Sequence, residues 1–241
     1  MTQIPDPLPP PPTDAGQGEW GSQPLYSRAD DLLWANAAAK ASLAADAAGW
    51  TNASAHLDHY LDNSGEVLHI NADTILRDVP DAAIRVNAIA ESELRRVAAE
   101  SLASQHFDVP VQFQSQWHEF YVTESMDSNW YFAMGGMEFS STGVVVVHRP
   151  GEGAEPSIAA EYKFHVFDRY NWDGEKSVDI AGVTITDARM GALHTAGLAR
   201  EYDIVGSSEI RRYEGVVPVE GSLNLPGTPG GRDGDRTDPT R

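Results

Sequence analysis

The spacing of apolar residues changes from a helical period to strict alternation near Pro110, and this change constrains the fold more than any other feature. From about residue 25 to residue 106 apolar residues recur every three or four positions, as on one face of a helix. Beyond Pro110 they alternate with polar residues, as on strands with one buried face; the clearest run is Val111, Phe113, Ser115 and Trp117 between Gln112, Gln114 and Gln116. Helices followed by antiparallel strands predict an α+β fold, with the N-terminal helical half packed on a C-terminal antiparallel β-sheet.

The helical half is predicted to contain a helical hairpin and one long helix. Two alanine-rich helices, 30–48 and 52–64, are separated by a short break at Gly49, with Thr51 or Asn52 as the expected cap of the second. A short helical turn over 73–78 and a long amphipathic helix after Pro80 follow.

The second half is predicted to contain several strands and one further helix. We expect residues 130–149 to form a hairpin that turns at 140–143, followed by strands at 157–170 and 183–185, a helix at 187–197 and a last strand region at 199–215.

The two ends differ in composition from the rest of the chain. Residues 1–23 and 218–241 are rich in Pro, Gly and polar residues, so we expect both to be disordered tails that make few contacts. A single domain over 24–217 remains, with a helical part at 24–106 and a strand part at 107–217.

The charge is strongly acidic, with 36 Asp and Glu against 17 Lys and Arg and a formal net charge of −19. Such a surface repels phosphate backbones and anionic membranes, so we expect no nucleic-acid partner and leave open a basic protein partner. The absence of cysteine excludes disulfides and thiol chemistry. We find no apolar run long enough to span a membrane and no signal-peptide pattern, and we expect a cytoplasmic protein or one exported without a cleaved signal peptide.

Polar and aromatic groups gather where the strand over 157–170 ends. The candidate catalytic residues, all within nine positions, are Asp168, Tyr170, Asn171, Asp173 and Lys176. The carboxylates of Asp168 and Asp173 are candidate ligands for Mg²⁺ or Ca²⁺. Alternatively, one carboxylate is a general base with Tyr170 or Lys176 as its partner, or the Asx side chains only satisfy the backbone of the turn.

His56 and His59 lie three positions apart on a predicted helix. This spacing could present two imidazoles to one metal ion, although no third ligand is evident nearby.

Part of the strand half resembles the C-terminal activity domain of colicin M-type bacteriocins. The resemblance lies in Gly135-Gly136-Met-Glu-Phe, Gly143-Val-Val-Val and a strand that leads into Asp168-Arg-Tyr170-Asn171. It implies an enzyme that hydrolyses the undecaprenyl pyrophosphate linkage of lipid II. The family motif is Asp-x-Tyr-Asp followed by His-Arg. Asp168 and Tyr170 match it, whereas Asn171 occupies the second aspartate position and Ser177-Val178 the His-Arg position.

A larger part of the chain is similar to uncharacterised actinobacterial proteins associated with type VII secretion or polymorphic toxins. The similar segments are 48–50, 56–61, 63–65, 168–173, 197–203 and 206–207. This resemblance implies no established activity.

Two functional hypotheses follow. The first is a bacterial effector-type or toxin-related domain of unknown chemistry, with its site at the strand end over 168–176. The alternative is a non-catalytic acidic binding or immunity-like protein that recognises a basic partner.

Overall fold

The architecture is α+β, as the change of periodicity predicts. The structure is a computed structural model that describes residues 2–13, 15–172, 177–180 and 183–227. The helical elements are η1 (Leu25–Ser27), α1 (Ala29–Ala47), α2 (Thr51–Leu61), α3 (Ala72–Asp78), α4 (Pro80–Ser104), α5 (Ser128–Ala133) and α6 (Asp187–Thr195). The strands are β1 (Leu68–Asn71), β2 (Pro110–Gln114), β3 (His118–Tyr121), β4 (Gly136–His148), β5 (Ser157–Tyr170), β6 (Ser177–Ile180), β7 (Val183–Thr186), β8 (Tyr202–Ser207) and β9 (Arg211–Val216).

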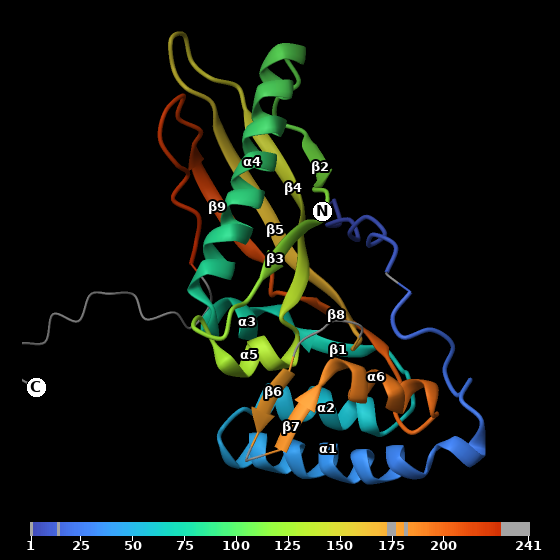
Figure 1. Ribbon diagram of the computed structural model, residues 1–241. Helices are drawn as coiled ribbons and strands as arrows, with labels where there is room; N and C mark the ends of the chain where they lie inside the picture. Colours follow the sequence, from blue (N-terminus) through green and yellow to red (C-terminus); the bar gives the residue numbers. More distant parts are fainter. Residues whose placement is uncertain (1, 14, 173–176, 181–182, 228–241) are drawn as a thin grey trace, which may run out of the picture.

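One sheet of seven strands runs through the elongated molecule (Figure 1). Its order is β1-β8-β5-β4-β2, with β3 also paired to β4 and β9 also paired to β5. All described pairs are antiparallel except that of β1 with β8, which is parallel. Strands β6 and β7 form a separate two-stranded sheet beside α1.

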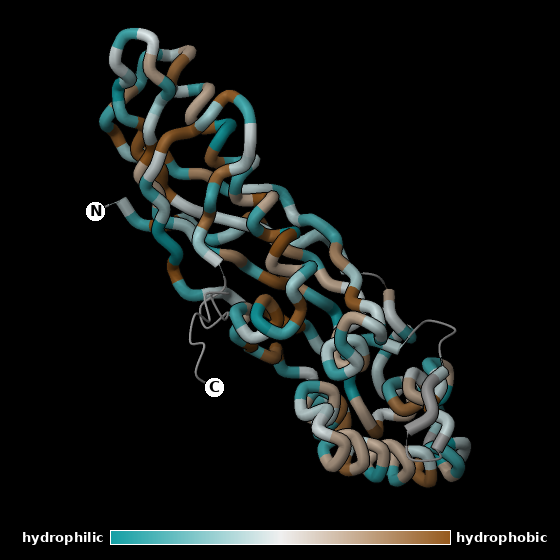
Figure 2. The backbone as a smooth tube through the Cα atoms, turned by 90° about the vertical axis from the view of Figure 1, so that its left-hand side faces the viewer, coloured by the Kyte–Doolittle hydropathy of each residue, from teal (hydrophilic) through white to brown (hydrophobic). Residues whose placement is uncertain are grey.

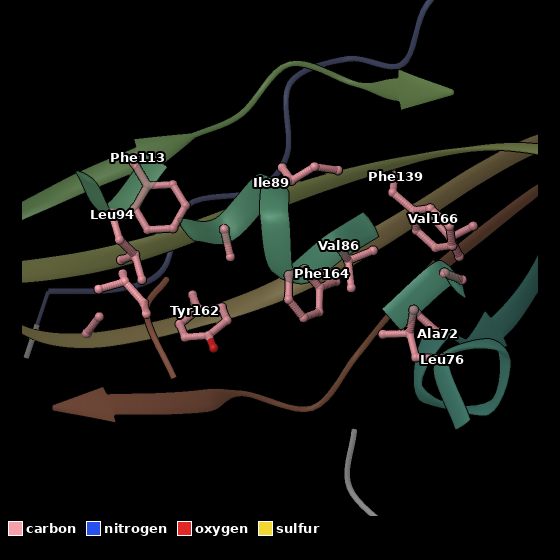
Figure 3. Close-up of a cluster of buried hydrophobic side chains, with 14 of the residues drawn as sticks. Ala72, Leu76, Val86, Ile89, Leu94, Phe113, Phe139, Tyr162, Phe164 and Val166 are labelled. Carbon is pink, nitrogen blue, oxygen red and sulfur yellow. The ribbon is translucent and has the colours of Figure 1, made fainter. Parts of the chain in front are cut away.

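Helix α4 covers one face of the sheet and buries the first of two hydrophobic clusters. Its apolar stripe, with Val86, Ile89 and Leu94, lies over the aromatic side chains of the strands (Figure 3). Phe139 and Phe164 are fully buried there. This end of the molecule therefore owes its packing to one amphipathic helix on one sheet face.

The hairpin of α1 and α2 lies at the other end, where α6 and the ends of β5 and β8 complete the second hydrophobic cluster. The break between the helices comes at Gly49, whose φ of +85° suits glycine. The cap of α2 differs from the expected Thr51 or Asn52. The amide oxygen of Asn129, on α5, accepts the backbone N–H groups of Asn52 and Ala53, each at 2.9 Å, and so joins α5 to α2.

The expected hairpin over 130–149 is wrong. Residues of its first half form α5, which begins where Asp127 accepts the N–H of Trp130 at 2.8 Å. The expected turn at 140–143 lies inside the continuous strand β4. Gly143 is needed there because a Cβ would lie 2.5 Å from the ring of Phe113, so the glycine marks close packing and not a turn.

The N-terminal segment also departs from expectation. Residues 2–13 and 15–23, here called the N-terminal strap, run along the body from β2 to α6 (dark blue in Figure 1; Figure 2 shows the N-terminal end after a turn of 90°). Glutamine and tryptophan side chains of the body donate hydrogen bonds to its backbone carbonyls, which compensates for its lack of apolar side chains.

The described part of the C-terminal segment docks as well. Arg95 of α4 donates to the carbonyls of Pro218, at 2.7 Å, and Gly221, and Leu223 enters the first hydrophobic cluster at 6 % exposure. The expectation of few contacts is therefore wrong for residues 218–227; the rest of that expected tail lies outside the described residues. No helix within the described ranges is both long and apolar enough to cross a membrane.

We predict that Leu223→Ala lowers the melting temperature by several degrees. Loss of a buried leucine costs about 2 kcal/mol or more, and a chain of this size loses about 2–4 °C per kcal/mol. The matched control is Val219→Ala in the same segment, because the Val219 side chain is exposed. Equal melting curves for the two variants would show that the C-terminal segment does not dock.

Candidate functional site

A cavity of about 820 Å³ opens where β5 ends beside α5 and the start of β4. Three of the sequence-predicted residues line it: Asp168, Tyr170 and Asn171. Asp173 and Lys176 lie outside the described residues. The structure thus brings together the first three candidates, and the chemical roles predicted for all five stay predictions.

Asp168 lies on β5 opposite Ile204 of β8. One of its carboxylate oxygens accepts the backbone N–H of Arg169 at 2.8 Å, and this hydrogen bond holds the Asp168 side chain against the backbone of the next residue. This hydrogen bond lies within β5 and not in a turn, so the alternative of turn-satisfying Asx side chains stays a prediction; Asp168 also lies on the cavity wall.

Tyr170 belongs to an aromatic cluster as much as to the cavity. Its ring stacks on Tyr202 with centroids 4.9 Å apart and lies edge-on to Trp172 and His56. Burial raises the pKa of the Tyr170 phenol far above its usual value, and the nearby Asp168 carboxylate raises it further. Tyr170 is therefore a neutral hydroxyl at physiological pH and cannot serve as an anionic base.

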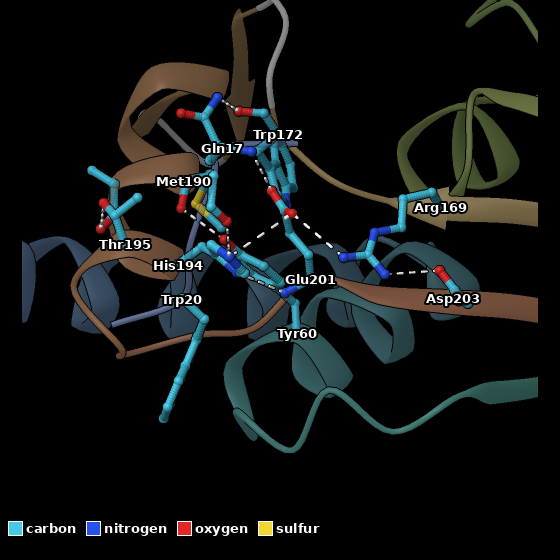
Figure 4. Close-up of polar contacts among 12 residues, drawn as sticks. Gln17, Trp20, Tyr60, Arg169, Trp172, Met190, His194, Thr195, Glu201 and Asp203 are labelled. Atoms are coloured by element: carbon cyan, nitrogen blue, oxygen red, sulfur yellow. Dashed lines mark hydrogen bonds and ion pairs between the residues drawn. The ribbon is translucent and has the colours of Figure 1, made fainter. Parts of the chain in front are cut away.

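Two buried hydrogen-bond donors belong to residues of the cavity wall. Arg169 Nη1 donates to Asp203 at 2.8 Å and its Nη2 lies 3.7 Å from Glu201 (Figure 4). Its Nε and the Nε1 of Trp172 have no hydrogen-bond partner within the part of the chain that the structure describes. Buried donors without acceptors are unfavourable, so each would gain from an oxygen acceptor; since neither atom is accessible to water, a ligand would reach them only after the wall moves.

Sequence reasoning missed an acidic pair on the cavity wall. Glu119 of β3 lies directly opposite Glu138 of β4, and both line the cavity. Burial raises the pKa of Glu138, and the neighbouring Glu119 adds to the rise. The pair is not visible in the sequence because the expected hairpin paired 130–139 with 144–149, and because residues 117–122 carry no alternation of apolar and polar side chains that would mark a strand.

The apolar wall was missed for the same reason. It includes Tyr121 of β3, Tyr131 and Phe132 of α5, and the glycines at which the chain turns into β4. Gly135 has a φ of +68° and so favours glycine. The cap formed by Asp127 was the local signal that predicts a helix here.

The structure gives no complete set of metal ligands among the residues it describes. No group of three or more His, Cys, Asp or Glu side chains is placed to hold an ion in these ranges. The Mg²⁺ or Ca²⁺ site predicted at Asp168 and Asp173 stays a prediction, since Asp173 lies outside them. His56 and His59 do not share a target, because His56 Nδ1 contacts the Ala133 carbonyl and His59 Nε2 that of Glu66, each at 2.9 Å.

Comparison with known proteins gives only distant structural neighbours. No family model and no curated protein matches the chain. PaeM, a colicin M-like bacteriocin produced by Pseudomonas aeruginosa, matches at 15 % identity and a TM-score of 0.39, over 69 % of this chain and 51 % of that one. The truncated bacteriocin syringacin M from Pseudomonas syringae pv. tomato DC3000 matches at 14 % identity and a TM-score of 0.31, over 70 % of this chain and 61 % of that one.

The fold of this chain therefore has a weak resemblance to that of colicin M-like bacteriocins. This chain spans about half to three fifths of their length. Similarity at this level carries no argument about function, which must rest on the site. The resemblance to actinobacterial proteins stays a prediction.

Protonation of His56 should make the fold sensitive to acid. Burial lowers the pKa of His56 to about 4 from a usual 6.5. Above pH 6.5 the imidazole is neutral in both states and contributes nothing; between pH 6.5 and 4 only the unfolded chain binds the proton. The free energy of unfolding should therefore fall by roughly 3 kcal/mol from this residue over that interval.

The variant His56→Gln should remove this part of the pH dependence, as measured by urea unfolding at pH 7.5 and 4.5. His165, whose pKa is also lowered to about 4 by burial, keeps its own part. The exposed His106, changed to Gln, is the matched control and should leave the pH dependence unchanged. A His56→Gln protein with the full pH dependence would contradict the assignment.

Proposed function

We propose that the chain is a toxin-related effector domain whose strand-end cavity binds an amphiphilic substrate with an oxygen-rich head group, and that Asp168 acts on that head. The observation that carries the proposal is the meeting of Asp168, Tyr170 and Asn171 with an aromatic wall in one cavity of about 820 Å³. Ligand cavities are mostly apolar with a few placed polar groups, as here.

Two donors that have no partner among the described residues support an oxygen-rich head group. Arg169 Nε and Trp172 Nε1 are both buried, and each can donate one hydrogen bond to a phosphate or sugar oxygen once the wall around it moves. The aromatic side chains of Tyr131 and Phe132 supply the opposite, apolar surface for a hydrocarbon chain.

The carboxylates on the wall add a condition to this proposal. Four carboxylate side chains line the cavity: Glu119, Glu138, Asp168 and Asp187. Among the described residues of the wall, Arg169 supplies the positive charge. A pyrophosphate placed among them would be repelled unless a cation accompanied it. We therefore propose that binding requires Mg²⁺ or Ca²⁺, with Asp168 and Asp173 as the first ligands to examine.

The test uses lipid II in detergent micelles, with Mg²⁺, with Ca²⁺ and with a chelator. We expect cation-dependent release of the undecaprenyl chain, and a decrease of at least about 100-fold in its rate for Asp168→Asn, since a positioned acid or base contributes 10²–10⁴-fold. Asp81→Asn, at the exposed start of α4 and not on the cavity wall, is the matched control.

Thermal unfolding in the same mixtures separates binding from turnover. A ligand at 100 times its Kd stabilises the folded state by about 2.7 kcal/mol. A protein that neither hydrolyses lipid II nor gains stability from it, with either cation, would refute the proposal. Stabilisation without hydrolysis would restrict it to binding.

The acidic binding protein remains as a second candidate because of two observations. Asn171 occupies the second aspartate position of the colicin M-type motif, and the net charge is −19. This candidate predicts capture of a basic protein that weakens steeply with salt and is insensitive to Asp168→Asn.

A further inference from the structure

We propose that the N-terminal strap is a lid for the strand-end cavity: residues 2–13 release the sheet and open the cavity, while residues 16–23 remain docked on α6. The meaning of this movement for activity rests on the proposed function, whereas the movement itself does not. Three observations carry the proposal: an anchor on buried side chains of the body at one end, an anchor on exposed glutamines at the other, and the cavity wall between them.

The anchor at residues 16–23 is polar, and its partners His194 and Glu201 on the body are buried (Figure 4). The backbone N–H of Gln17 donates to Glu201 Oε1 at 3.1 Å, and His194 Nε2 lies 3.1 Å from the carbonyl of Gly18. His194 Nδ1 accepts the N–H of Glu201, so Nε2 carries the proton and donates to the strap. Since His194 and Glu201 are each 4 % exposed, separation would leave buried polar groups without partners.

Further contacts hold the same end. The N–H groups of Gly21 and Gln23 donate to the carbonyls of His194 and Thr195, at 3.1 and 2.9 Å. The Trp20 indole donates to Asn63 at 2.9 Å and lies under the guanidinium of Arg200. This half of the strap is therefore part of the folded body.

The anchor at residues 2–13 depends on three side chains of the body. The contacts are Gln112 Nε2 to the Gln3 carbonyl (2.7 Å), Gln114 Nε2 to the Asp6 carbonyl (2.6 Å) and Trp117 Nε1 to the Leu8 carbonyl (2.9 Å). Six of residues 5–12 are proline, which has no N–H, so this half cannot pair as a strand of the sheet. Both glutamines are exposed, and such contacts open at low free-energy cost.

The packing beneath this half is incomplete. A second cavity, of about 390 Å³, lies between the strap at Asp6, Pro7 and Pro10 and the sheet at Trp117 and His165. At these three positions the strap therefore does not pack closely on the sheet.

The cavity wall lies between the two anchors. Pro11, Pro12 and Thr13 line the strand-end cavity, so the position of this half determines how the cavity meets solvent. The chain turns at Gly16, whose φ of +52° favours glycine and which stands just before the anchored Gln17 and Gly18. Gly16 separates the weakly held half from the firmly held one and provides the hinge.

Cysteine reactivity measures the opening directly because the chain has no cysteine. Gly136→Cys places a thiol on the cavity wall, where the nearest atom to the new Cβ is in the Tyr121 ring at 3.5 Å, an ordinary contact. The rate of reaction with a bulky thiol reagent is compared in three full-length proteins. The first carries Gly136→Cys alone. The second adds Gln112→Ala and Gln114→Ala, and the third adds Gln116→Ala instead.

We expect the double glutamine variant to react about tenfold faster, because two hydrogen bonds that favour the closed lid are lost. Gln116 is exposed, and its side chain makes no hydrogen bond to the strap in the described structure, so its variant should react at the original rate. The melting temperature of each protein shows that the body stays folded.

If all three proteins react at the same rate, Trp117→Phe is added to the double glutamine variant to remove the third donor. A reaction rate that still does not rise would overturn the proposal. Should Gly136→Cys not fold, Met134→Cys on the same wall serves as the reporter. Lipid II is absent from this experiment, so a lid without lipid II hydrolysis, or hydrolysis without a lid, is recognised as such.

Discussion

The antiparallel pair of β4 and β5 is the interaction on which the rest of the structure depends. The pairing extends from Glu138 opposite Phe167 to His148 opposite Ser157. Strands β2 and β9 flank one part of it under α4, and β3 and β8 flank the other. Because β4 begins at Gly136 and β5 ends at Tyr170, both strands leave the pair at the same place, and the cavity forms there.

Elements with a long, regular pattern could be predicted from the sequence. Helix α4 follows Pro80 and β5 spans 157–170, both as expected, because each carries one apolar face over many residues. Strand β1 could not be predicted, since it has four residues and its parallel partner β8 is far away in the sequence. The polar centre of β4 has the composition of a turn, but long-range contacts satisfy its polar groups inside the sheet: Ser115 with Ser141, and His165 with Thr142.

The candidate site could be located from the sequence, but its walls could not. The cluster at the end of β5 identifies Asp168, Tyr170 and Asn171 because strand ends often carry functional side chains. The facing walls come from β3, α5 and the N-terminal strap, which only tertiary packing brings together. Composition suggested that the strap is disordered because it lacks apolar residues, yet side-chain donors of the body hold its carbonyls.

The end of β5 also connects the site to the strap. Asp168 contributes to the cavity wall, and four residues further on the carbonyl of Trp172 accepts Gln17 Nε2 at 2.5 Å. Between them Tyr170 stacks on Tyr202, so this strand end is fixed by aromatic packing. A ligand that displaced Trp172 would disturb the firm anchor of the strap as well as the cavity. Binding in the cavity and docking of the strap therefore share one structural element, which gives a physical route for each to affect the other.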